Sequence, residues 1–225
     1  MFSIDGKLFK GLTKAGDFLI LGFLMVVFSL PVITLGASVT AAFYVALKLV
    51  RDEEGYVFKG FIKSFKENFK QGFLIELIVG ILGVFVIEDI RICMYWAEGG
   101  NSLARLAMYA FFGIALVLIA VTMYVFPMLA KFDNTVIGTL KNALLISMHH
   151  LGQTFVMLLA MGVLTAVTVK FFTAAIITIP LALYIDSYIL SRVFKIYADQ
   201  SVAQPDENAD KIEDAVQDND TDGQE

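Results

Sequence analysis

Uncharged residues run without interruption from Phe18 to Leu47, and lysines lie on both sides of this block. Three precede it, and further basic residues follow it from Lys48 onward. One helix needs only about 20 apolar residues to cross roughly 30 Å of hydrocarbon, so the block is longer than a single span requires. A soluble core in a chain of 225 residues would not cover such a run. The pattern therefore predicts an integral membrane protein.

Further apolar segments follow at 71–87, 106–130, 151–169 and 171–190, and we expect each to be a full membrane-spanning helix. The predicted fold class is thus an all-α polytopic membrane helical bundle over residues 1–198. It has four full spans behind the N-terminal block. From Asp199 the chain carries ten acidic residues and one lysine, which predicts a disordered acidic cytoplasmic tail over 199–225.

The N-terminal block, 18–47, admits two interpretations. Pro31 lacks a backbone N–H and ends a helical turn, and Gly36 permits the dihedral angles of a reversal. Together they predict a helix break, and with it a broken or re-entrant helical hairpin of two short arms. The alternative is one long, tilted and kinked helix, which would place the N-terminus outside the cell. The sequence leaves both open.

Residues 57–73 form an amphipathic pattern in which phenylalanines recur at helical spacing beside a stripe of lysines: Lys59, Lys63, Lys66 and Lys70. We expect an interfacial helix at the cytoplasmic membrane face, attracted to anionic lipids. In a rival interpretation, the phenylalanine face packs as core against the ends of the spans. Acidic residues among the lysines argue against binding to nucleic acid.

The distribution of basic residues orients the bundle in the cell membrane. Segments 48–70 and 131–150 and the end of the last span are basic, whereas 88–105 is short and slightly acidic. The positive-inside rule therefore places both termini in the cytoplasm and 88–105 outside.

Two acids lie within apolar runs, Asp186 and Glu76, and both are candidate intramembrane ionisable residues. Such groups are costly in hydrocarbon and mark functional sites by default. The simpler alternative for each is an acid close to the inner interface, where it stays hydrated. Asp186 precedes Arg192 by six residues, and Glu76 follows Lys70 by the same number.

Catalytic chemistry finds no support in the sequence. We recognise no nucleophile–base pair, no phosphate-binding glycine loop and no carboxylate cluster suited to hydrolysis. A lone cysteine, Cys93, excludes an intramolecular disulfide and a cysteine-based metal site. We therefore predict a protein that is not an enzyme and that holds neither a cofactor nor a metal.

The stretch SLPVITLGASVTAAFYVALKLVRDEEGYVFKGFIKSFKENFKQG resembles the YesL family of uncharacterised membrane proteins from Gram-positive bacteria. DGKLFKGLTKAGD and IDSYILSRVFKIYAD, near the two ends of residues 1–198, are similar to the same family. The resemblance implies an association with carbohydrate utilisation and sugar uptake, and hence an accessory or regulatory partner of a sugar transporter. The alternative function is a small-solute transporter that acts as a homo-oligomer.

Overall fold

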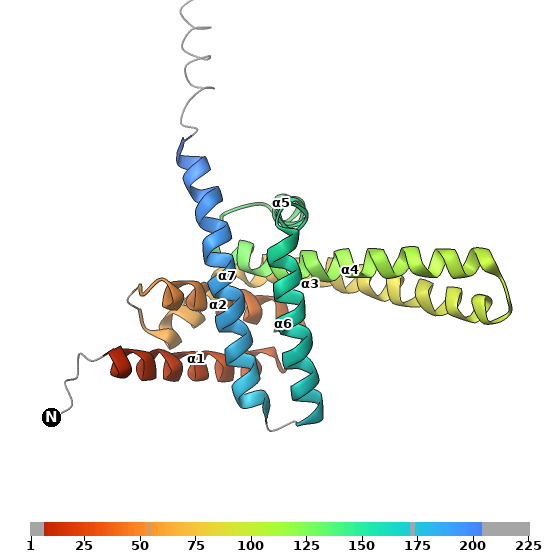
Figure 1. Cartoon of the computed structure of the whole chain (residues 1–225). Helices are drawn as coiled ribbons and strands as arrows, with labels where there is room; N and C mark the ends of the chain where they lie inside the picture. Colours follow the sequence, from red (N-terminus) through yellow and green to blue (C-terminus); the bar gives the residue numbers. More distant parts are fainter. Residues whose placement is uncertain (1–6, 54, 172–173, 204–225) are drawn as a thin grey trace, which may run out of the picture. The chain divides into compact units, whose positions relative to one another are not determined.

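The computed structural model describes residues 7–53, 55–171 and 174–203, and the description below concerns these residues. They form helices joined by short loops, with no strand among them (Figure 1). This confirms the all-α class. The helices are α1 (Lys7–Ser29), η1 (Val32–Thr34), α2 (Leu35–Val50), α3 (Val57–Glu98), α4 (Ser102–Lys131), α5 (Val136–His149), α6 (Leu151–Lys170) and α7 (Ala175–Ala203).

Five helical segments in the described residues are long and apolar enough to cross a membrane: Lys10–Ser29, Val32–Val50, Ser102–Lys131, Leu151–Lys170 and Ala175–Tyr197. The last three correspond to the predicted segments 106–130, 151–169 and 171–190. The first two divide the N-terminal block between them. The chain separates into two compact units, Met1–Ile189 and Leu190–Glu225, and the contacts described below lie within the first.

Helices α1 and α2 form an antiparallel hairpin. The Ser38 hydroxyl donates to the carbonyl of Met25 near the turn (2.9 Å), and Lys14 pairs with Asp52 at the open end (2.8 Å). Pro31 lies in the break with an extended backbone, φ −75° and ψ 116°. Of the two interpretations of 18–47, the structure has the hairpin. Gly36 lies inside α2 rather than in the break.

The end of α2 is closed by a Schellman motif. The N–H of Asp52 donates to the carbonyl of Leu49, and the N–H of Glu53 donates to the carbonyl of Lys48. Asp52 occupies the left-handed position, φ 56°, which aspartate tolerates better than most side chains. The motif turns the chain toward α3 and leaves the Asp52 carboxylate facing Lys14.

Helix α2 is the central helix of the first unit, and it packs against α1, α3 and α4. Its buried positions are mostly small, and they include Ala37, Ala41, Ala42 and Ala46. Small side chains allow neighbouring backbones to approach closely. The closest approach is between Gly36 of α2 and Gly72 of α3. A Cβ atom on Gly36 would collide with the carbonyl oxygen of Gly72, and one on Gly72 would lie 2.9 Å from the backbone nitrogen of Ala37.

Helix α3 corrects the predicted boundaries. The interfacial helix expected at 57–73 and the span expected at 71–87 are parts of one uninterrupted helix of 42 residues. No proline lies in this stretch, and Gly72 is buried against α2, so nothing breaks the helix there. A helix lying flat at the interface and then turning into a separate span is therefore not what the chain forms.

Two other features differ from expectation. Segment 131–150, expected to be a cytoplasmic loop, contains α5, which the sequence reasoning missed. Helix α7 continues to Ala203, so the first residues of the predicted tail 199–225 are helical. The rest of that tail lies outside the described residues.

The contact between Gly36 and Gly72 predicts that a methyl group added at either glycine destabilises the protein, whereas one added at Gly80 does not. Gly36→Ala and Gly72→Ala should each destabilise the protein by about 1–3 kcal/mol, because backbone opposes the new Cβ and cannot rotate away. Gly80→Ala on the same helix meets no atom within 4 Å and should be neutral or stabilising. Thermal unfolding in detergent measures all three. Equal stability of the three variants would contradict the close contact.

Candidate functional site

A small pocket of about 250 Å³ lies where the end of α2 meets the start of α3. Lysines from both helices line it, together with two tyrosines: Lys48, Lys59, Lys63, Tyr44 and Tyr56. We call this the basic pocket. The antiparallel packing of α2 and α3 creates it, because Gly60 of α3 lies beside Val45 of α2.

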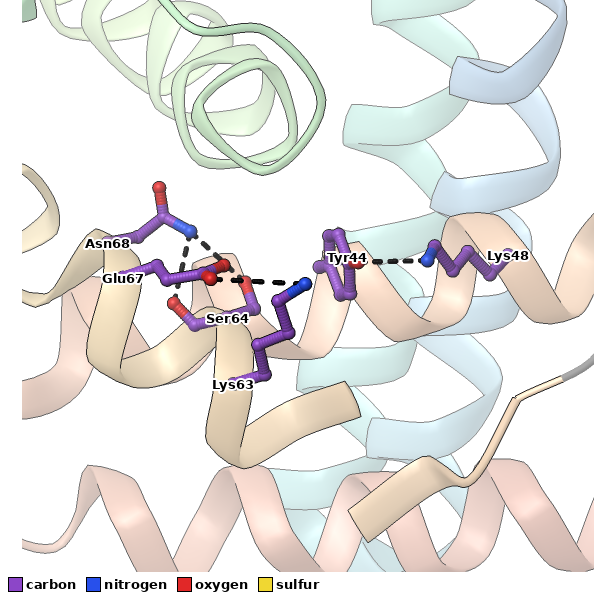
Figure 2. Close-up of polar contacts among 6 residues, drawn as sticks. All are labelled: Tyr44, Lys48, Lys63, Ser64, Glu67 and Asn68. Carbon is purple, nitrogen blue, oxygen red and sulfur yellow. Dashed lines mark hydrogen bonds and ion pairs between the residues drawn. The ribbon is translucent and has the colours of Figure 1, made fainter. Parts of the chain in front are cut away.

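Two of these lysines contact the tyrosines of the pocket. The Lys48 ammonium donates to the Tyr44 hydroxyl (2.8 Å), as Figure 2 shows. The Lys59 ammonium lies 5.0 Å from the centre of the Tyr56 ring, a cation–π distance. The Lys63 ammonium is 4.0 Å from a carboxylate oxygen of Glu67, one turn further along α3.

Acidic residues around the basic pocket are engaged with other basic residues. Glu53, which also lines the pocket, pairs with Arg51 at 3.2 Å. Asp52 pairs with Lys14, and the hydrogen bond and charge of Lys14 hold the pKa of Asp52 below its usual value. The pocket therefore keeps a positive balance despite the acids in its loop.

The structure divides the predicted stripe of four lysines. Lys59 and Lys63 line the basic pocket, whereas Lys66 and Lys70 are exposed further along α3 and do not line it. Lys48 completes the pocket from α2, and the sequence reasoning gave it no role at a site. The available signal was the spacing of Tyr44 and Lys48, four residues apart on one helix face.

The phenylalanine face of α3 supports the rival packing interpretation in part. Phe61 and Phe65 contact Phe28 of α1 with ring centroids 5.3 and 5.2 Å apart. Phe58 and Phe73, by contrast, are exposed. The centre of the phenylalanine face therefore packs against α1, whereas its two ends are exposed.

Glu76 has a structural partner. Its carboxylate accepts a hydrogen bond from the backbone N–H of Gly36 at 2.9 Å. Gly36 lies in the first turn of α2, where backbone N–H groups lack intrahelical partners and the helix dipole favours a negative charge. Glu76 therefore caps α2 from the neighbouring helix, one turn beyond the contact between Gly36 and Gly72.

Asp186 lies in a different setting. Its side chain is only 4% exposed, and its Oδ1 atom has no hydrogen-bond partner among the described residues. It lines an apolar cavity of about 900 Å³, whereas Glu76 lines a separate groove. Asp186 also falls at the midpoint of the candidate span Ala175–Tyr197, with eleven residues on either side. The two predicted acids are therefore not brought together.

Metal ligands do not cluster in the part of the chain that the structure describes. No group of three histidine, cysteine, aspartate or glutamate side chains there has the geometry to hold an ion.

A family model described as a protein of unknown function, DUF624, matches residues 18–90. Over this stretch the chain is similar to an uncharacterised family, and the stretch contains most of the α1–α2 hairpin, the basic pocket and Glu76. Asp186 lies outside it. Neither the curated proteins nor the solved structures gave a match.

The cap by Glu76 predicts a graded response to substitution. Glu76→Ala removes the acceptor for Gly36 and should cost about 1–3 kcal/mol of stability. Glu76→Gln keeps a carbonyl acceptor and should cost less, because only the charge is lost. Glu98→Ala, at an exposed acid on the same helix, is the matched control. Thermal unfolding in detergent compares them, and equal losses for the alanine and glutamine variants would refute the hydrogen bond.

Proposed function

We propose that this protein is a non-catalytic integral membrane protein of the cell membrane, whose basic pocket binds the phosphate of anionic lipid headgroups. The observation that carries the proposal is the convergence of three lysines from two helices on one pocket beside two tyrosines. Each basic residue near a membrane surface contributes about 1 kcal/mol of attraction to anionic lipid. Tyrosine is itself enriched at membrane interfaces, which supports the same assignment.

The position of the lysines along α3 supports a re-entrant hairpin. The lysine-bearing part of α3 runs beside α2, from Val45 opposite Gly60 to Gly36 opposite Gly72. If α2 crossed the bilayer completely, exposed lysines would lie at its centre, where each costs about 2.5–3.5 kcal/mol on insertion scales. The hairpin therefore enters and leaves on the cytoplasmic side. The apolar part of α3, predicted at 71–87, is not among the five candidate spans, and we infer that it crosses together with α4, α6 and α7. Four crossings place both termini on one side of the membrane, and the basic segments place that side in the cytoplasm.

The physiological role that we propose is that of an accessory or regulatory component linked to carbohydrate uptake. Its support is the resemblance of the first 198 residues to the YesL family. The match to an uncharacterised family over residues 18–90 is compatible with that resemblance and adds no activity. The basic pocket gives such a component a surface for lipid or for a partner at the cytoplasmic face.

A second candidate function is a small-solute transporter that acts as a homo-oligomer. The observation that favours it is the cavity lined by Asp186, because buried ionisable residues between membrane helices are typical of solute pathways.

Removing the charges of the basic pocket should remove bound anionic lipid. The variant Lys48→Gln, Lys59→Gln, Lys63→Gln should purify with several-fold less phosphatidylglycerol than the parent protein. The control Lys66→Gln, Lys70→Gln, Lys141→Gln loses the same charge at exposed positions outside the pocket. Mass spectrometry of the retained lipid measures both. An equal loss in the control would assign the attraction to general surface charge and would contradict the pocket.

The re-entrant topology predicts which positions a membrane-impermeant thiol reagent reaches in intact cells. Cys93→Ser provides a cysteine-free background. In that background, Glu98→Cys should be labelled, and Ser3→Cys and Gly55→Cys should be protected until the cells are permeabilised. Ile33→Cys, at the turn of the hairpin within the bilayer, should not be labelled in intact cells. Labelling of Ser3→Cys from outside would overturn the cytoplasmic N-terminus. Labelling of Ile33→Cys would instead show that the hairpin crosses completely.

A further inference from the structure

The cavity lined by Asp186 has the size and composition of a ligand site. Its volume of about 900 Å³ lies within the range of small-molecule pockets. Residues of five helices line it, among them Met25 of α1, Phe43 of α2, Phe126 of α4 and Met161 of α6. Walls from five helices leave room for a compact molecule more readily than for another helix.

Among the described residues that line the cavity, Asp186 is the one with an ionisable side chain. The residue is only 4% exposed, and its Oδ1 atom has no hydrogen-bond partner among the described residues. Two hydroxyls, those of Thr122 and Thr165, also line the wall, and the Thr122 hydroxyl donates to the carbonyl of Leu118 at 2.7 Å rather than to Asp186. Burying a carboxylate oxygen without a partner is unfavourable, so a ligand that supplies one would be favoured here.

We propose that the cavity binds a lipophilic monocation, an organic ammonium or phosphonium ion whose apolar groups fill the walls while its charge pairs with Asp186. Charge complementarity selects a cation, and the apolar lining selects one with hydrocarbon or aromatic substituents. A hydrated inorganic ion would find no second oxygen ligand of comparable charge on these walls. The cavity is not sealed, because Leu35 and Ile119 on its wall are exposed, and they provide an apolar route of entry.

This inference deepens the second candidate function, because it names the ligand class of the same cavity. Equilibrium binding and transport are measured separately, so the two can fail separately. Binding without flux in proteoliposomes would support the site and remove the transporter. Absence of binding would refute this cation site. Transport of a different solute would then be tested by flux measurements with that solute.

The test is equilibrium dialysis of the full-length protein in detergent against radiolabelled tetraphenylphosphonium, with protein-free micelles as the baseline. The parent protein should bind one cation per chain saturably. Tetraphenylborate has the same size and shape with the opposite charge, and in a separate dialysis it should not bind saturably. Asp186→Asn should weaken cation binding at least tenfold. Asp133→Asn, the same change at an exposed acid, should leave it unaltered.

A second variant separates loss of charge from loss of space. Gly162 lines the cavity, and a Cβ atom there meets nothing within 4 Å, so the backbone tolerates a side chain at this position. Gly162→Leu should reduce the space in the cavity and weaken binding while Asp186 remains. Equal binding of phosphonium and borate, or unaltered binding in Asp186→Asn, would overturn the proposal. If Asp186→Asn fails to fold, the comparison of phosphonium with borate and the Gly162→Leu variant still test it in folded protein.

Discussion

The contact between Gly36 and Gly72 is the constraint on which the rest of the first unit depends. It brings the backbones of α2 and α3 together at a distance that admits no side chain. That contact fixes the antiparallel register of the two helices. The register then places Glu76 against the N–H of Gly36 and, at the opposite end, Lys48 beside Lys59. A cap and a pocket at opposite ends of α2 thus follow from one packing contact.

The local features of this chain could be read from its sequence, because they depend on neighbours along the chain. Uncharged runs located α4, α6 and most of α7, and Pro31 located the break between α1 and α2. The continuity of α3 was missed because the lysine-rich pattern of 57–73 gives way to an apolar run, a change that is typical of a boundary between an interfacial helix and a span. The sequence does not state that both parts belong to one helix that packs against α2. Helix α5 was missed because it lies in the mildly basic segment 131–150 between two longer uncharged runs, where a cytoplasmic loop is expected.

The candidate acids show where sequence reasoning ends. Glu76 and Asp186 are both single carboxylates within apolar runs, so the same rule selects both. Their tertiary contacts distinguish them. Glu76 finds an N–H group forty residues away, whereas the Oδ1 atom of Asp186 finds no partner in the described part of the chain. Glu76 is therefore accounted for by the fold, and Asp186 requires an explanation outside it.

The stretch that matches the family model supplies only part of the cavity wall. Part of the cavity wall, including Met25, Val39 and Phe43, belongs to the matched stretch 18–90, whereas the charged residue does not. The hairpin that supplies this wall is held by contacts at Gly36, Gly72 and Glu76, none of which involves Asp186. The chemistry of residue 186 can therefore change without disturbing the packing of the hairpin. The hairpin thus shapes one wall of the cavity, whereas the other walls and the carboxylate come from α4, α6 and α7.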